Sequence, residues 1–119
     1  MERSDENHAE SITIIEGPTP EFRPATETWT HSLNESVDGN VVAYCQMRTL
    51  NGPRMTERCQ VAWNQGRPVQ LDFPDGMGLR QQANIVAVRW TEVEEGHLLH
   101  LWVRVPLEQV QQDWDFPIE

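Results

Sequence analysis

The order of hydrophobic and polar positions predicts β-strands over much of the chain from residue 41 onward. Residues 69–73 alternate strictly between the two kinds, which is the pattern of a strand with one buried face. Residues 41–50, 83–93 and 97–105 carry apolar side chains at both odd and even positions, which is typical of strands covered on both faces. The residues Glu94-Glu95-Gly96 between the last two segments predict a hairpin with a three-residue loop.

Between residues 53 and 65 the hydrophobic positions follow a helical period instead. They fall at i, i+4, i+7 and i+8, on one stripe of a helix: Met55, Cys59, Ala62 and Trp63. Pro53 suits the first turn of this helix and Gly66 suits its C-terminal end. The competing interpretation is a hairpin strand over residues 55–64, which we disfavour because period-two alternation fails there.

The pattern is weaker toward both ends of the chain. Residues 11–16 and 26–33 are rich in β-branched and aromatic side chains and predict two further short strands. Residues 77–82 show no period and are expected to form a loop. From Pro106 onward, apolar residues at helical spacing predict a short C-terminal helix.

Together these elements predict an α+β fold with a mainly antiparallel, mixed sheet of four to six strands and one packed helix near 53–65. A chain of 119 residues is long enough for one hydrophobic core and too short for two ordinary domains. We expect a single domain over residues 11–115, between a flexible acidic tail at 1–10 and a frayed end at 116–119.

The net charge of −10 is unevenly distributed. Residues 1–38 carry nine acids against two arginines, a net of −7, and residues 91–119 carry seven acids against one arginine, a net of −6. Residues 39–90 carry six arginines against three acids, a net of +3. The overall charge argues against nonspecific binding to nucleic acid or to an anionic membrane, because both require a basic surface.

The apolar runs of this chain are short. None approaches the roughly 18 residues of a membrane span. The first ten residues are polar and acidic, unlike a secretory signal. We therefore expect a cytoplasmic protein.

The side chains that most often hold metals or act as nucleophiles are scattered. Cys45 and Cys59 are 14 positions apart with no histidine nearby, and we expect two buried free thiols. His97 and His100 are three positions apart, which on a strand places them on opposite faces. The chain contains no phosphate-binding loop and no catalytic signature, so we expect no cofactor, no metal and no catalytic residue.

Arginines supply the strongest candidate for a ligand site. Arg54 and Arg58 are four positions apart on one face of the predicted helix and, with Arg67, could bind a phosphate or carboxylate. The string from Arg54 to Arg58 is similar to the RxxxR motif of PilZ domains, and that resemblance implies binding of cyclic di-GMP. The second motif of that family, D/N-x-S-x-x-G, is missing, so we expect no cyclic-dinucleotide binding at this face.

The hairpin over residues 83–105 supplies the candidate for a protein interface. If Val93 pairs with His97, then Trp90, Leu98, His100 and Trp102 share one face and the other face is equally apolar. A single helix covers only one face of a sheet. We therefore name those four residues as interface candidates for a homodimer or a permanent partner contact.

These observations favour a non-enzymatic protein that acts through protein–protein contacts, as a homo-oligomer or as an accessory subunit, with no nucleic-acid or membrane partner. The alternative is a small-ligand or nucleotide-binding regulator that uses the arginine-lined anion site. A third hypothesis is an enzyme whose site combines His100 with Glu92 or Asp72.

Overall fold

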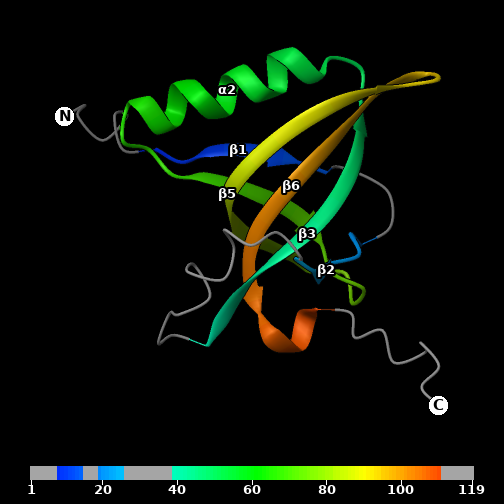
Figure 1. Ribbon diagram of the computed structural model, residues 1–119. Helices are drawn as coiled ribbons and strands as arrows, with labels where there is room; N and C mark the ends of the chain where they lie inside the picture. Colours follow the sequence, from blue (N-terminus) through cyan, green and yellow to red (C-terminus); the bar gives the residue numbers. More distant parts are fainter. Residues whose placement is uncertain (1–7, 15–18, 26–38, 111–119) are drawn as a thin grey trace.

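The computed structural model describes residues 8–14, 19–25 and 39–110 (Figure 1). Its elements are six strands, one α-helix and one 3₁₀ helix: β1 (Glu10–Thr13), β2 (Arg23–Pro24), β3 (Asn40–Thr49), α2 (Gly52–Asn64), β4 (Val69–Pro74), β5 (Arg80–Val93), β6 (Gly96–Pro106) and η2 (Leu107–Gln109). The predicted α+β class, with one packed helix and a mostly antiparallel sheet, is confirmed. The short C-terminal helix is a 3₁₀ turn that follows β6 directly.

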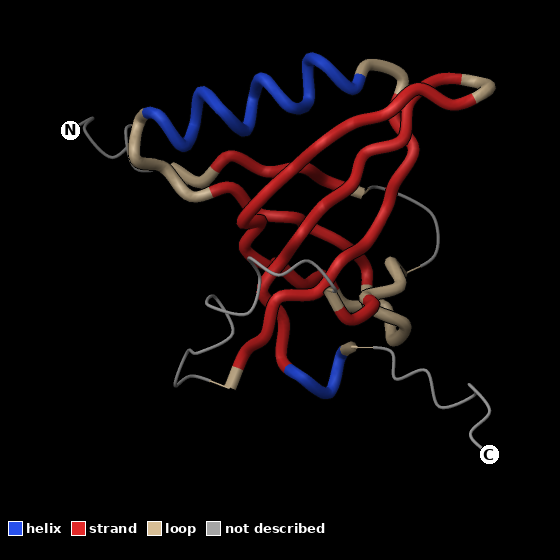
Figure 2. The backbone as a smooth tube through the Cα atoms, viewed as in Figure 1, coloured by secondary structure: helices blue, strands red, loops and turns tan. Residues whose placement is uncertain are grey.

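The six strands form one sheet in the order β1-β4-β5-β6-β3-β2. All neighbours run antiparallel except β1 and β4, which are parallel, so the sheet is mixed. Helix α2 connects β3 to β4 and packs chiefly against β5, with further contacts to β1, β4 and β6. Figure 2 shows the helix lying across one face of the sheet and the tip of the β5–β6 hairpin projecting beyond the helix.

Local sequence explains why α2 begins and ends where it does. The Asn51 side chain accepts a hydrogen bond from the backbone N–H of Arg54 at 3.1 Å and caps the first turn. Gly66 has a φ of +74° just beyond the helix, a conformation that glycine adopts without steric cost. The helix buries Cys59 and Ala62 on its inner side, as its hydrophobic stripe predicted. The alternative of a strand at 55–64 is therefore wrong.

The hydrophobic core lies between α2 and the concave face of a strongly curved sheet. Phe22, beside the edge strand β2, contacts Phe73 of β4 with ring centroids 5.2 Å apart, although three strands separate β2 from β4 in the sheet order. The Thr19 hydroxyl also donates to the Pro74 carbonyl at 2.9 Å. The sheet therefore curls until its two halves meet, and this curvature closes the core.

The register of the β5–β6 hairpin differs from the prediction in two ways. Val93 pairs with Gly96, so pairing begins one residue earlier than expected and the turn itself is Glu94-Glu95. A β-bulge between Ile85 and Ala87 then shifts the pairing by one further residue. Because strand side chains alternate, each shift of one residue reverses the face on which the partner side chain lies.

As a result, the predicted assignment of residues to the two faces of the hairpin is wrong. The inner face receives residues from both predicted sets: Ile85, Val88, Trp90, Leu99, Leu101, Val103 and Val105. The outer face is mixed in polarity and carries Ala87, Arg89, Thr91, Leu98, His100, Trp102 and Arg104. Near the turn the outer face of the hairpin is exposed or half-buried, whereas further along β6 Trp102 on the same face is only 5% exposed, so the outer face is covered there.

Smaller differences concern the ends of elements. Glu10, assigned to the tail, is the first residue of β1, and that strand ends at Thr13 rather than at Glu16. The segment 77–82 is only partly a loop, because β5 already begins at Arg80. The strand expected at 26–33 and the ends at 1–7 and 111–119 lie outside the described residues.

Candidate functional site

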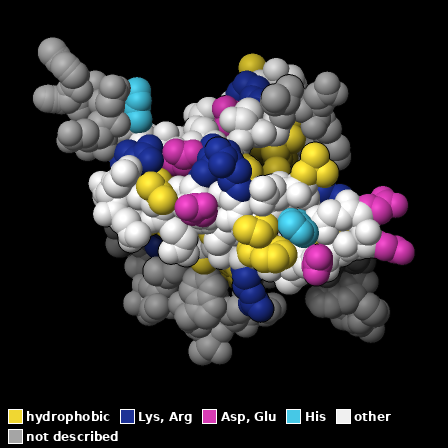
Figure 3. All heavy atoms as spheres, turned by 90° about the horizontal axis from the view of Figure 1, so that it is seen from above, with side chains coloured by type: hydrophobic (Ala, Val, Ile, Leu, Met, Phe, Trp, Pro, Cys, Tyr) yellow, Lys and Arg dark blue, Asp and Glu magenta, His cyan; other side chains and the backbone are white. Residues whose placement is uncertain are grey.

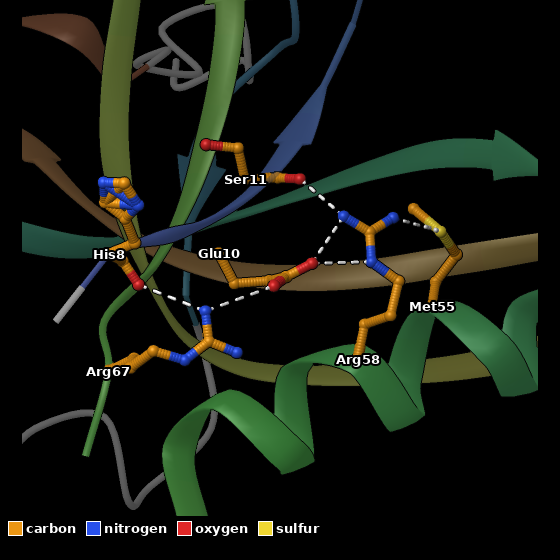
Figure 4. A network of polar contacts seen from close by, with 6 residues as sticks. All are labelled: His8, Glu10, Ser11, Met55, Arg58 and Arg67. Carbon is orange, nitrogen blue, oxygen red and sulfur yellow. Dashed lines mark hydrogen bonds and ion pairs between the residues drawn. The ribbon is translucent and has the colours of Figure 1, made fainter. Parts of the chain in front are cut away.

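Two of the three predicted anion-binding arginines lie together, but a carboxylate of the protein itself already lies between them (Figure 4). Arg58 of α2 donates from Nε to Glu10 Oε2 at 2.7 Å and from Nη2 to the Ser11 carbonyl at 2.8 Å. Arg67 approaches the other oxygen of the same carboxylate, with Nη1 at 3.5 Å from Glu10 Oε1, and donates to the His8 carbonyl at 3.1 Å. The pair therefore holds strand β1 against the helix.

A third arginine supports the opposite end of the same strand. Arg80 of β5 donates from Nη2 to the Ile14 carbonyl at 2.8 Å and forms an ion pair with Asp72 at 3.1 Å. Strand β1 has only four residues and pairs in parallel with β4, so it gains few ladder hydrogen bonds of its own. The arginines at its two ends make up for this small number of ladder bonds.

Arg54 lies apart from this network. It is exposed on the helix, and within the described segments its guanidinium takes part in no hydrogen bond or ion pair. Seen from the helix side, arginine and acidic side chains lie next to one another with hydrophobic groups between them (Figure 3). The structure thus brings Arg58 and Arg67 together around Glu10 and leaves Arg54 outside the group.

A second cluster lies on the outer face of the sheet, toward the tip of the β5–β6 hairpin. We call this surface the tip face and define it by the outward-facing side chains of three adjacent strands: Tyr44, Gln46 and Arg48 of β3, Leu98 and His100 of β6, and Arg89 and Thr91 of β5. Gln46 and Arg89 lie on either side of His100, and Arg48 and Thr91 lie on either side of Leu98. These two levels across the strands, one centred on His100 and the other on Leu98, are about 7 Å apart, because side chains on one face recur every second residue.

Hydrogen bonds join four residues of the tip face into a chain. Gln46 Nε2 donates to the Tyr44 hydroxyl at 2.8 Å, and that hydroxyl lies 2.5 Å from His100 Nδ1. His100 Nε2 lies 2.9 Å from the Thr91 hydroxyl. Both ring nitrogens of His100 are therefore engaged, which fixes the orientation of the imidazole. The Tyr44 ring also stacks on that of His100, with centroids 5.9 Å apart.

The imidazole of His100 has a lowered pKa. Partial burial disfavours its charged form, and the guanidinium of Arg89 on the neighbouring strand lowers the pKa further. Neither carboxylate that sequence reasoning offered as a catalytic partner lies beside it. Glu92 is opposite His97 on the other face, and Asp72 is paired with Arg80.

The tip face is cationic in an otherwise acidic protein. Arg48 and Arg89 are exposed, and neither guanidinium has a hydrogen bond or ion pair with the residues that the structure describes. No Asp or Glu lies on the outer face of the described strands β3, β5 and β6, since Glu92 points to the inner side. The other described acids on the hairpin, Glu94 and Glu95, are exposed at its turn.

The four interface candidates divide between the two faces. Leu98 and His100 are half-buried members of the tip face, whereas Trp102 on the same face is only 5% exposed and offers little area to a partner. Trp90 lies on the inner face, 37% exposed, where its ring contacts that of His97 at a centroid distance of 4.7 Å. The four residues therefore do not form one surface.

Sequence reasoning missed the tip face as a unit. Its signal was present in β3, where Tyr44, Gln46 and Arg48 alternate with buried or half-buried residues. It was hidden in β5, because the predicted pairing of Val93 with His97 places Arg89 and Thr91 opposite Leu101 and Leu99, whereas the observed pairing of Val93 with Gly96 places them opposite His100 and Leu98.

Among the described residues, no cluster of side chains is suited to binding a metal or to thiol chemistry. Cys45 and Cys59 are buried free thiols, and burial raises their pKa to about 12 and about 11, so both are protonated and unreactive near neutral pH. Within the described segments no group of three or more His, Cys, Asp or Glu side chains could hold a metal ion. In those same segments no helix is long and apolar enough to cross a membrane.

Comparison with protein-family models, with characterised proteins and with solved structures finds no match to this chain.

Proposed function

We propose that this protein is a non-enzymatic binding module that acts through contacts with a polypeptide, and that the tip face is its docking surface. The observation that carries the proposal is the pair of exposed arginines, Arg48 and Arg89, on a sheet face without acids. Arginine and tyrosine are enriched where protein interfaces gain their binding energy. Leu98 supplies an apolar centre between the two arginine-bearing strands.

The shape of the surface supports contact with a chain rather than with a small molecule. The tip face lies on three adjacent strands and continues to a projecting hairpin tip (Figure 2). Small ligands are generally bound in concave sites that bury most of their surface. An acidic polypeptide segment could lie across the strands and pair with both arginines, and the local positive charge would attract it in spite of the negative total.

The alternative of an anion site at Arg58 and Arg67 receives less support. An external phosphate or carboxylate would have to displace Glu10, and it would thereby release β1 from the helix. We also propose a reducing compartment such as the cytoplasm, which is supported by two thiols that remain free in the fold.

The proposal is tested by photocrosslinking in the cells that make the protein. A photoreactive residue is placed at Gln46 on the tip face and, as a control, at Gln60 on the exposed side of α2. We expect discrete protein crosslinks from position 46 that are absent from position 60. Arg48→Glu with Arg89→Glu should abolish them, and Arg54→Glu should not. Equal yields from the two positions would reject the tip face as a docking surface.

A further inference from the structure

The outer edge of strand β3 is paired over only part of its length. On one side, all ten residues of β3 pair with β6. On the other side, β2 pairs with Ala43 and Tyr44. Of the residues that the structure describes, none pairs with that edge between Cys45 and Thr49, where β3 is the outermost described strand (Figure 1). Backbone N–H and C=O groups of alternate residues in this stretch therefore point away from the sheet.

The chain that precedes β2 explains why this edge stays open. An antiparallel continuation of β2 would place Phe22 opposite Cys45. Phe22 is instead buried, with its ring against that of Phe73 on β4, and the Thr19 hydroxyl donates to the Pro74 carbonyl. Residues 19–22 therefore leave β3 and cross toward β4, because their side chains close the core there. The edge of β3 from Cys45 onward is left open to a further strand.

From this arrangement we infer that the polypeptide partner adds a strand to the open edge of β3, and that this strand is an extended segment in which acidic residues alternate with apolar ones. The inference rests on the function proposed above and specifies how the partner engages the tip face. Strand addition gains affinity from main-chain hydrogen bonds along an exposed edge, and alternate side chains supply the specificity. Residues 45–49 offer the length of a common short strand.

The side chains of β3 select the sequence of the added strand. Residues directly opposite each other in a sheet lie on the same face. Arg48 is exposed on the outer face, so an Asp or Glu opposite it forms a cross-strand pair of opposite charges. Met47 on the inner face is half-buried and packs against the core, so an apolar residue opposite it removes further apolar surface from water. Gln46 lies on the outer face again, and an acid opposite it is a diagonal neighbour of Arg48.

The two arginines of the tip face contribute unequally in this arrangement. The added strand lies about 4.8 Å from β3 and about 14 Å from β5, because neighbouring strands are evenly spaced. Arg48 of β3 therefore contacts the added strand directly. Arg89 of β5 attracts it only over a distance at which salt screens the charge, and its guanidinium is left for the part of the partner that continues over the tip face. A segment lying across the strands would contact both arginines alike.

The test titrates the full, isotope-labelled chain with the synthetic peptide acetyl-Ser-Glu-Val-Glu-Val-Glu-Ser-amide at low salt and follows backbone amide signals by NMR. We expect saturable shifts at residues 45–49. Arg48→Glu should weaken binding by at least about tenfold, because it opposes like charges across the new pair. Arg89→Glu should weaken it by less than about threefold. Arg54→Glu, on the exposed side of α2, should leave it unchanged, and thermal melting should show that all variants fold.

A second peptide separates strand addition from simple charge attraction. It has the same side chains, but every backbone nitrogen from the first Glu to the last is methylated, so it cannot donate main-chain hydrogen bonds. This peptide should not bind. Binding of the methylated peptide, equal losses for Arg48→Glu and Arg89→Glu, or no shift at residues 45–49 overturns the inference. If position 46 then still yields the arginine-dependent crosslinks, the proposed function stands and the partner lies over the tip face without extending the sheet.

Discussion

The closed side of the molecule, where α2 and β1 lie, and the tip face both carry arginines, but the arginines are engaged differently. Arg58 and Arg67 contact the Glu10 carboxylate and nearby carbonyl groups, so their charge is used within the fold. Arg48 and Arg89 have no such partners among the described residues and face solvent. The same residue type thus serves the stability of the fold in one region and is exposed without such contacts in the other.

The difference follows from what each region has to accomplish. Strand β1 is short and lies at an edge, so its position depends on side-chain contacts. Strands β3, β5 and β6 are long and paired along their lengths, so they need no arginine to hold them. Charged side chains on such a rigid support are positioned by the backbone at little cost to the fold.

The largest expected change in the free energy of unfolding distinguishes the inner face of β6 from its outer face. Leu99 is fully buried on the inner face of β6, and its neighbour Leu98 is half-buried on the tip face. Leu99→Ala should lower the free energy of unfolding by about 2–5 kcal/mol through lost burial and a residual cavity. Leu98→Ala should cost less than about 1.5 kcal/mol. Urea unfolding of both variants measures the contrast, and equal losses would contradict the assignment of the faces.

Close packing between α2 and β5 predicts the second-largest loss of stability. A Cβ added at Gly52 would lie 2.7 Å from the Cβ of Trp90, which is shorter than any normal contact. Gly52→Ala should therefore destabilise the protein by about 1–3 kcal/mol, although alanine usually favours a helix. Gly76→Ala is the matched control, because nothing lies within 4 Å of its added Cβ. A stable Gly52→Ala variant would show that the hairpin does not press on the helix.

The two sets of arginines can be compared through their partners. Glu10→Ala removes the carboxylate shared by Arg58 and Arg67 and should destabilise the protein by about 1 kcal/mol, since the pairs are partly exposed and screened. Hydrogen exchange should become faster at residues 10–13. Arg89→Gln on the tip face should change stability by less than about 0.5 kcal/mol. A larger loss from Arg89→Gln would mean that the tip face also serves the fold.

The smallest expected effect is a pH dependence that arises on the tip face. The folded pKa of His100 is lowered, so on acidification the unfolded chain takes up this proton before the folded protein does. Its contribution to stability is complete above the ordinary histidine pKa of about 6.5 and is lost as the pH falls through that value toward the folded pKa. The loss between about pH 7 and pH 5 should be smaller for His100→Asn than for the wild type. Parallel slopes for the two proteins would contradict this assignment.

Much of the fold could be predicted from periodicity because local pattern and tertiary environment agree in it. The stripe through Cys59 and Ala62 and the Asn51 cap define α2, and strict alternation defines β4. The bulge at residues 85–87 could not be predicted, because it changes the pairing by one residue without a distinctive sequence such as glycine or proline. The register at the turn, where Val93 pairs with Gly96 rather than with His97, decided which side chains share the tip face.

The sequence by itself determined the α+β class, the helix and the positions of the main strands, since these depend on the spacing of apolar residues along the chain. It also determined that arginines gather between two acidic flanks. Only the tertiary structure decided which arginines are engaged. Glu10 meets Arg58 across 48 positions of sequence, and Arg48 joins Arg89 on one face through the pairing of three strands. Contacts of this kind depend on strand order and register, which local propensity does not encode.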